Sequence, residues 1–148
     1  RKMNEYQHIL LAVDLSEDSQ LLAERAAALA MQNDAKLSLV HTIEPINFAY
    51  GGDIPMDLSA IQEQLDEHAH IKVAEFARKF NIAEQNQHIV VGLPQNEIHR
   101  IAREFNVDLI VVGTHGRHGL SLLLGSTSNG VLHGAECDVL AVRVGKNS

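Results

Sequence analysis

The sequence predicts a doubly wound α/β domain: a five-stranded, mostly parallel sheet with helices on both faces. Three observations indicate this fold. Short apolar runs typical of strands alternate along the chain with longer segments of helical periodicity. The strand runs are continuously apolar, as in parallel sheets that are covered on both faces. The chain has 148 residues, a length that suits one domain with a substantial core.

The N-terminal part of the chain predicts a strand, a helix and a second strand. The first strand covers residues 8–13 and ends in Asp14-Leu15-Ser16. The helix that follows extends to about Gln32, and its alanine-rich face can pack close to a sheet. The second strand covers residues 36–43. Such a βαβ unit has a right-handed crossover.

The rest of the chain repeats this alternation after an irregular segment, Glu44 to Asp57, which we expect to be an exposed loop because it contains two prolines and a glycine pair. We expect Asn106 to take a left-handed conformation at a helix end. The predicted helices are 58–80, from Gln95 or Asn96 to 105, and 126–133; the predicted strands are 88–91, 109–112 and 139–144.

A glycine-rich turn links the strand at 109–112 to the helix at 126–133. Its glycines allow a close backbone approach, and the N–H groups at a helix start favour an anion. Many glycine turns are plain connections, however, and this one matches neither of the common phosphate-binding fingerprints. Phosphate binding and a structural turn therefore both remain open from the turn alone. The residues concerned are Gly113, Gly116, Gly119, Gly125, Ser126, Thr127 and Ser128.

Three of the predicted loops follow the carboxyl ends of strands, where ligands bind in open parallel sheets. They begin at Asp14, at Thr42 and at Gly113. An acid, a polar edge and a phosphate cradle at one end of a sheet predict a mononucleotide site. The alternative is that Asp14 only shapes a turn and that Ser126 and Thr127 only cap a helix.

Composition excludes several classes of function. The net charge of −7 disfavours a nucleic-acid or acidic-membrane surface, and no apolar run is long enough to span a membrane. The single cysteine, Cys137, cannot form an internal disulfide, so we expect a cytoplasmic protein with a structural thiol. We expect no metal site and no redox cofactor: His68 and His70 would lie on different faces of a helix, and the His115/His118 pair has no cysteine or carboxylate nearby in sequence.

Arg1 and Lys2 precede Met3, and we expect Met3 to be the native start. Residues 1–2 would then be an added remnant, and residues 3–148 a single domain.

Several motifs together resemble the universal stress protein family, in its UspA-like form. The run from His8 to Ser16 is similar to the family's first strand and its Val-Asp-x-Ser turn. Residues 91–94, VGLP, resemble a Val-Gly-x-Pro segment, and residues 108–116 with 123–126 resemble the C-terminal motif. The resemblance covers nearly the whole chain and implies a Rossmann-like fold of the adenine-nucleotide alpha-hydrolase type.

The resemblance implies binding of ATP or AMP, with or without Mg, in a stress-response or regulatory module. One branch of the family binds ATP through Gly-x-x-Gly, nine residues and Gly-Ser/Thr, whereas the other does not bind it. Here only eight residues separate Gly116 from Gly125. By position, the nucleotide-binding residues would be Ala12, Val13, Asp14, Thr42, Gly113, Gly116, Arg117, Gly125, Ser126 and Thr127.

The final predicted strand is an apolar sheet edge, which a second copy could cover across a two-fold axis. The resemblance implies such a homodimer through Val139, Leu140, Ala141, Val142, Arg143 and Val144.

We expect a binding module rather than an enzyme, because the sequence shows no Walker lysine and no acidic cluster for a metal clamp. A dimeric scaffold without nucleotide and a slow ATPase are the alternatives.

Overall fold

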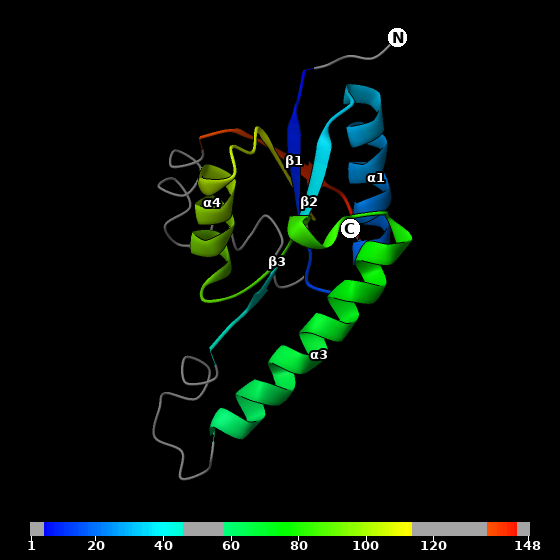
Figure 1. Cartoon of the computed structure of the whole chain (residues 1–148). Helices are drawn as coiled ribbons and strands as arrows, with labels where there is room; N and C mark the ends of the chain where they lie inside the picture. Colours follow the sequence, from blue (N-terminus) through cyan, green and yellow to red (C-terminus); the bar gives the residue numbers. More distant parts are fainter. Residues whose placement is uncertain (1–4, 46–57, 114–135, 145–148) are drawn as a thin grey trace.

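The computed structural model describes residues 5–45, 58–113 and 136–144. Its five strands form one sheet in the order β3-β2-β1-β4-β5, and all four pairings between them are parallel. The order reverses direction between β1 and β4, which places the topological switch point between these two strands. Figure 1 shows the sheet with helices on both sides, and the predicted fold class is confirmed.

The strands lie close to their predicted positions. The differences are small: β1 ends one residue early, β3 and β4 each gain a residue, and β5 begins one residue earlier and ends two residues earlier than expected. The strands are β1 His8–Ala12, β2 Lys36–Ile43, β3 Gln87–Val91, β4 Leu109–Gly113 and β5 Asp138–Val142. β1 and β4 are buried along their whole length, as their continuous apolar sequences predict.

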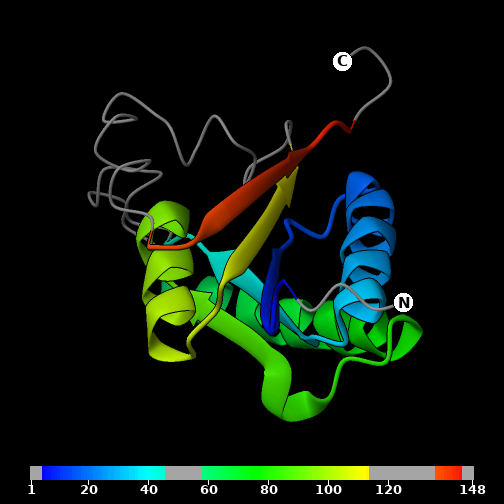
Figure 2. The ribbon, with the colours of Figure 1, turned by 90° about the horizontal axis from the view of Figure 1, so that it is seen from above.

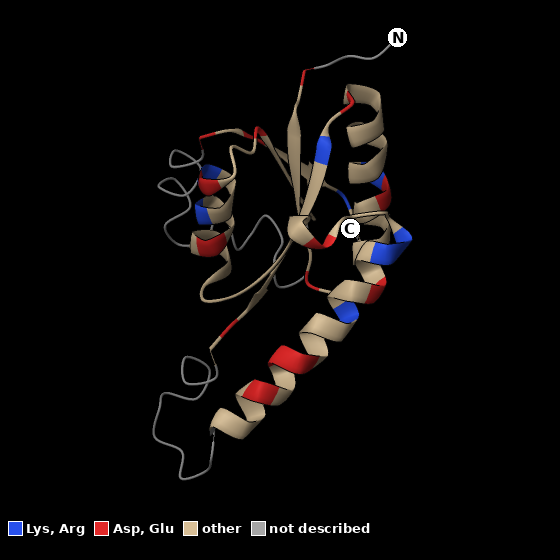
Figure 3. Cartoon of the chain, in the orientation of Figure 1, with Lys and Arg blue, Asp and Glu red and all other residues tan. Residues whose placement is uncertain are grey.

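Helices α1 (Asp18–Asn33) and α3 (Leu58–Lys79) cover one face of the sheet. Ala23 and Ala26 of α1 are fully buried against Ile9, Leu11 and Val111, so the small alanine side chains bring the helix close to the strands. Helix α3 contributes Ala69, Val73 and Ala77, which recur every four residues along its buried side. Its last turn carries Arg78 and Lys79 (Figure 3), which suits the negative end of the helix dipole.

Helix α4 (Pro94–Glu104) covers the opposite face, as the view in Figure 2 shows. Ile98, Ile101 and Ala102 pack on Leu10 and Val40. The helix begins at Pro94, one residue before the predicted start, because proline suits the first helical position. A short 3-10 turn, Glu84–Asn86, precedes β3.

Left-handed residues end the helices. Asp34 after α1, Asn81 after α3 and Asn106 after α4 have φ values of 55°, 57° and 56°. Asn106 is the residue for which this conformation was predicted, and that prediction is confirmed.

Some predictions lie outside the described residues: the helix at 126–133 and most of the loop at 44–57. In the described part of the chain, no helix is long and apolar enough to cross a membrane.

Candidate functional site

The carboxyl ends of β1, β2 and β4 adjoin one another at one edge of the sheet. Residue pairing places Ala12 beside Val40 and Leu11 beside Val111, and the same register continued puts Thr42 level with Asp14 and Gly113 level with Val13. Asp14 follows β1, Thr42 lies near the end of β2, and Gly113 ends β4. The switch point between β1 and β4 lies at this edge, where α/β sheets bind ligands.

Asp14 shapes the turn that leads from β1 into α1. Its Oδ1 accepts hydrogen bonds from the Ser16 amide at 2.9 Å and from the Ser19 hydroxyl at 3.2 Å. Leu15, between Asp14 and Ser16, has a φ of 64°, a left-handed conformation that is uncommon for a leucine. Strained backbone of this kind is often found at functional sites, where surrounding contacts hold it in place. The carboxylate is therefore fixed in position at the mouth of the switch point.

The backbone amide and the backbone carbonyl of Val13 both form hydrogen bonds. Its amide donates to the Val40 carbonyl at 3.0 Å, and its carbonyl accepts a hydrogen bond from His41 Nδ1 at 3.0 Å. His41 is half-buried, which confirms the interpretation of this residue as a core or edge histidine.

Thr42 is buried, with 3% of its surface exposed, and within the described ranges its Oγ1 has no hydrogen-bond partner. An unsatisfied buried hydroxyl is unfavourable by about 1–3 kcal/mol. By the alternation of β2, its side chain lies on the α4 face of the sheet together with Val40. A buried hydroxyl of this kind can be satisfied by an ordered water, an ion or a ligand.

The structure thus brings together five of the predicted nucleotide-binding residues: Ala12, Val13, Asp14, Thr42 and Gly113. A cavity of about 10 Å³ lies beneath them, between the ends of β1 and β4 and the start of α1, and it has room for no more than one water molecule. Any larger ligand would lie above the edge. The predicted residues Gly116, Arg117, Gly125, Ser126 and Thr127 lie outside the described residues, as do His115 and His118.

Sequence reasoning missed the left-handed Leu15 and the His41 bond to Val13. Leucine carries no signal for a positive φ. The polar His41 within a mostly buried strand was a signal, but its partner follows a different strand and could not be read from spacing.

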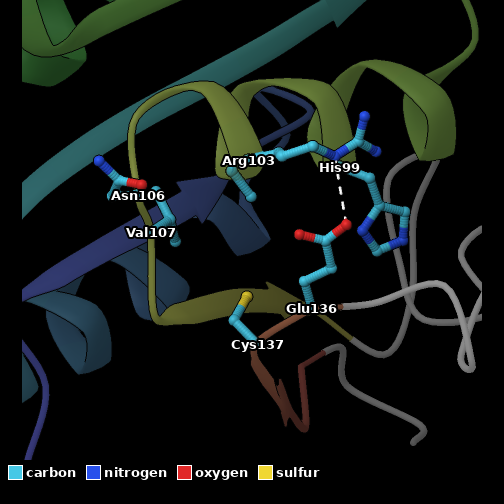
Figure 4. Close-up of a pocket in the computed structure, with 7 residues that line it drawn as sticks. His99, Arg103, Asn106, Val107, Glu136 and Cys137 are labelled. Atoms are coloured by element: carbon cyan, nitrogen blue, oxygen red, sulfur yellow. Dashed lines mark ion pairs between the residues drawn. The ribbon is translucent and has the colours of Figure 1, made fainter.

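A second cavity, of about 250 Å³, lies between the end of α4 and the start of β5 (Figure 4). Arg103 Nε lies 3.4 Å from Glu136 Oε1 across it, and the Cys137 thiol is on its wall. Burial, followed by the nearby carboxylates of Asp138, Asp108 and Glu136, raises the pKa of Cys137 to about 11. The thiol is therefore protonated at neutral pH and is a poor nucleophile, which confirms its structural interpretation.

His99 also lines this second cavity, and its Nε2 is buried without a hydrogen-bond partner. Burial is the main reason that the pKa of His99 is lowered, and the positive charge of Arg103 adds to the effect. Within the described ranges, no three His, Cys, Asp or Glu side chains are grouped so that they could hold a metal ion.

Comparison with known proteins identifies the family. A profile of the Universal stress protein family matches residues 5–143. The chain belongs to the universal stress protein family. Universal stress protein A homolog 1 of Coxiella burnetii is 44% identical over 138 residues, which are 93% of this chain and 96% of that protein. Homolog 2 of the same organism is 44% identical over 146 residues, which are 96% and 98% of the two chains.

Solved structures of the universal stress protein fold agree with this assignment. Hypothetical protein MJ0577 is 28% identical, with a TM-score of 0.74 over 97% of this chain and 99% of its own. A universal stress protein in complex with cAMP is 28% identical, with a TM-score of 0.58 and coverage of 93% and 97%. UspA from Lactobacillus plantarum is 27% identical, with a TM-score of 0.65 and coverage of 93% and 98%.

Proposed function

We propose that this universal stress protein binds an adenine nucleotide, ATP or AMP, at the carboxyl edge between β1, β2 and β4. The observation that carries the proposal is the convergence of Asp14, Thr42 and Gly113 at the topological switch point. The complex of a structural neighbour with cAMP supports an adenine nucleotide as the class of ligand.

The chemistry of the edge suits an adenosine group. The Asp14 carboxylate can accept hydrogen bonds from a ribose hydroxyl or an exocyclic amine, and the buried Thr42 hydroxyl can donate to a ring nitrogen or accept from an amine. The proposed phosphate cradle consists of Gly113 with Gly116, Arg117, Gly125, Ser126 and Thr127. Magnesium would accompany ATP by neutralising its phosphates.

We propose binding rather than catalysis. Asp14 Oδ1 accepts hydrogen bonds that hold the β1–α1 turn, so the carboxylate serves as an acceptor and not as a base, and the thiol of Cys137 is protonated at neutral pH. The protein would act in the cytoplasm as a regulatory module whose nucleotide state other proteins detect. A slow ATPase requires in addition a positioned water and a metal clamp.

The proposed module is a homodimer that pairs through β5. This strand is at the end of the strand order, and its Val139, Leu140 and Ala141 are half-buried. Val142 and Val144 face inward, with 6% and 2% exposure, so substitutions there would test the core of the subunit rather than the seam. Arg143 is exposed and offers the better probe.

The test is a calorimetric titration of the nucleotide-stripped protein with Mg-ATP, AMP and cAMP. We expect micromolar binding of at least one nucleotide, loss of binding in Gly116→Val, and affinity about tenfold lower in Thr42→Val, because one hydrogen bond is lost. Thr42→Ser keeps the hydroxyl and is the matched control, which should bind normally. Equal affinity in wild type and Thr42→Val would contradict the placement of the site.

The absence of heat from all three nucleotides would favour the dimeric scaffold instead. The eight-residue spacing between Gly116 and Gly125 is the specific observation behind that alternative. A one-residue deletion displaces backbone donors by up to about 3.5 Å, beyond hydrogen-bond tolerance unless the loop adjusts.

A further inference from the structure

Two histidines and a serine lie near the amino ends of β1, β2 and β3, and both histidines contact Phe105. His8 opens β1, Ser38 lies in β2 and His88 lies in β3. All three lie on the face that α4 covers, as the pairing of Leu10 with Ser38 and of Val40 with His88 requires. His8 and Ser38 are buried, with 6% and 1% exposure, and His88 is half-buried.

The hydrogen bonds of His8 fit a neutral imidazole. Nδ1 lies 2.9 Å from the Phe105 carbonyl oxygen, which can only accept, so Nδ1 carries a proton. Nε2 lies 2.6 Å from the Ser38 hydroxyl and in the neutral ring accepts its proton. Both ring nitrogens are therefore satisfied without a charge, and a second proton on Nε2 would reverse the bond to Ser38, whose own buried hydroxyl proton would lose this acceptor.

Both histidines hold Phe105, the residue that directly follows α4. His8 binds its carbonyl, and the ring of His88 packs on its ring with the centroids 4.6 Å apart. The next residues are fixed to the same end of β1. The Asp108 carboxylate accepts the amides of Gln7 and His8 at 2.9 and 3.0 Å, and the Asp108 amide donates to the His8 carbonyl at 3.0 Å.

We propose that His8, Ser38 and His88 form a proton-sensitive clasp, which holds the end of α4 and residues 105–108 on the sheet at neutral pH and releases them on acidification. Protonation places a positive charge on a ring that has almost no contact with water, and a second positive charge follows on its neighbour. The neutral pair packs and hydrogen-bonds well, whereas the charged pair repels.

The charged groups around the clasp only partly compensate for this burial. Burial is the main cause that lowers the pKa of His8, and Lys36 on β2 lowers it further, whereas the Phe105 carbonyl and Asp108 oppose the shift. For His88, burial again comes first, and His8 and then Arg100 on α4 act in the same direction, opposed by Glu104. The net shift of the pKa is downward for both rings.

A lowered pKa in the folded protein fixes the direction of the pH dependence. Above about pH 6.5 both rings are neutral in the closed and in the open state, and they contribute no pH dependence. Below this pH the open state takes up protons that the closed state resists, so acidification favours opening. Each proton taken up multiplies the opening equilibrium about tenfold per pH unit until the pKa of the closed state is reached.

The first test follows the ring resonances of the wild-type protein by NMR from about pH 7.5 to 5. We expect the rings of His8 and His88 to stay neutral below pH 6.5, and titration of either ring at or above this value would overturn the proposal. This measurement needs no variant and is independent of nucleotide binding.

The second test measures amide hydrogen exchange over the same pH range. We expect the protection factors of the Val107 and Asp108 amides to fall by about tenfold per pH unit for each proton, and to fall faster than that of the Val13 amide at the far end of β1. Equal loss at all three amides would indicate global unfolding and would contradict a local clasp.

Variants assign the protons to particular rings. His88→Phe keeps an aromatic ring on Phe105 but cannot be protonated. The pH dependence of the protection factors at Val107 and Asp108 should therefore weaken by the contribution of about one proton. His68→Gln, at an exposed position on α3, is the control and should leave this pH dependence unchanged. If the protection factors of His88→Phe depend on pH as steeply as those of the wild type, His88 is not part of the clasp.

Discussion

Thr42 shows at the scale of one residue how a binding site differs from an ordinary core position. Its neighbours in β2 have satisfied surroundings: Val40 packs in the core, and the His41 ring binds the Val13 carbonyl. Thr42 is nearly as deeply buried as Val40, but its hydroxyl has no hydrogen-bond partner among the residues that the structure describes. Burial of such a group is a stability cost, which a ligand that supplies the missing bond would offset.

Thr42→Val should therefore stabilise the nucleotide-free protein. Valine has nearly the same shape and removes the unpaired hydroxyl, so we expect the free energy of unfolding to rise by about 1 kcal/mol. Urea denaturation with and without saturating nucleotide measures it, and the gain should shrink or reverse when nucleotide is bound. A loss of stability in the nucleotide-free variant would mean that the hydroxyl has a partner in the folded protein.

At the scale of elements, α1 shows how residue size sets the distance between a helix and the sheet. Ala23 and Ala26 have no exposed surface, and they face β1 and β4 through side chains of a single carbon. Among the larger residues of α1, Leu22 is buried in the same cluster, whereas Leu29 is only partly buried against it. The short spacing also fixes the start of α1 next to Asp14, whose carboxylate binds Ser19 in the first turn of the helix.

Ala26→Leu should therefore destabilise the protein by about 1–3 kcal/mol, because three added carbons have no space between α1 and the strands. Ala28→Leu is the matched control: it makes the same change on the same helix at an exposed position, and it should alter stability by no more than about 0.5 kcal/mol. Thermal and urea unfolding of both variants provide the comparison. Similar effects at the two positions would mean that helix propensity, rather than packing, decides the outcome.

The elements were predictable because their sequences carry the pattern of their environment. The buried strand at 109–113 is continuously apolar, and Asn106 has a side chain that tolerates a left-handed turn. The positions of Asp14, Thr42 and Gly113 at one edge followed from the alternation of strands and helices alone. Contacts set by strand register could not be read in this way. The meeting of His8, Ser38 and His88 depends on three segments that are far apart in the sequence.

At the scale of the whole molecule, the two ends of the strands carry different proposed sites. The carboxyl ends of β1, β2 and β4 carry the proposed nucleotide site, and the amino ends carry the proposed clasp. The two edge strands of the sheet differ as well. β3, at one end of the strand order, contacts α3, and β5 stands next to β4 at the other end. A second copy at β5 would extend the sheet without covering either end of the strands.

The proposed dimer makes a charge pattern at β5 testable. In an antiparallel pairing of β5 with its copy, centred between Leu140 and Ala141, Arg143 of each chain lies opposite Asp138 of the other. Arg143→Glu then places two like charges together at two symmetric positions, and we expect the dimer dissociation constant to rise about tenfold or more. Sedimentation velocity over a range of concentrations measures it.

Two further variants show whether the effect comes from the pairing. Lys72→Glu makes the same charge reversal at an exposed position on α3, and it should leave the dimer intact. Asp138→Lys combined with Arg143→Glu exchanges the two charges and should recover part of the affinity, although the Tyr6 hydroxyl then loses its acceptor at 2.7 Å. An Arg143→Glu protein that dimerises as tightly as the wild type would exclude this register, because the proposed pairing cannot avoid the contact between the two carboxylates.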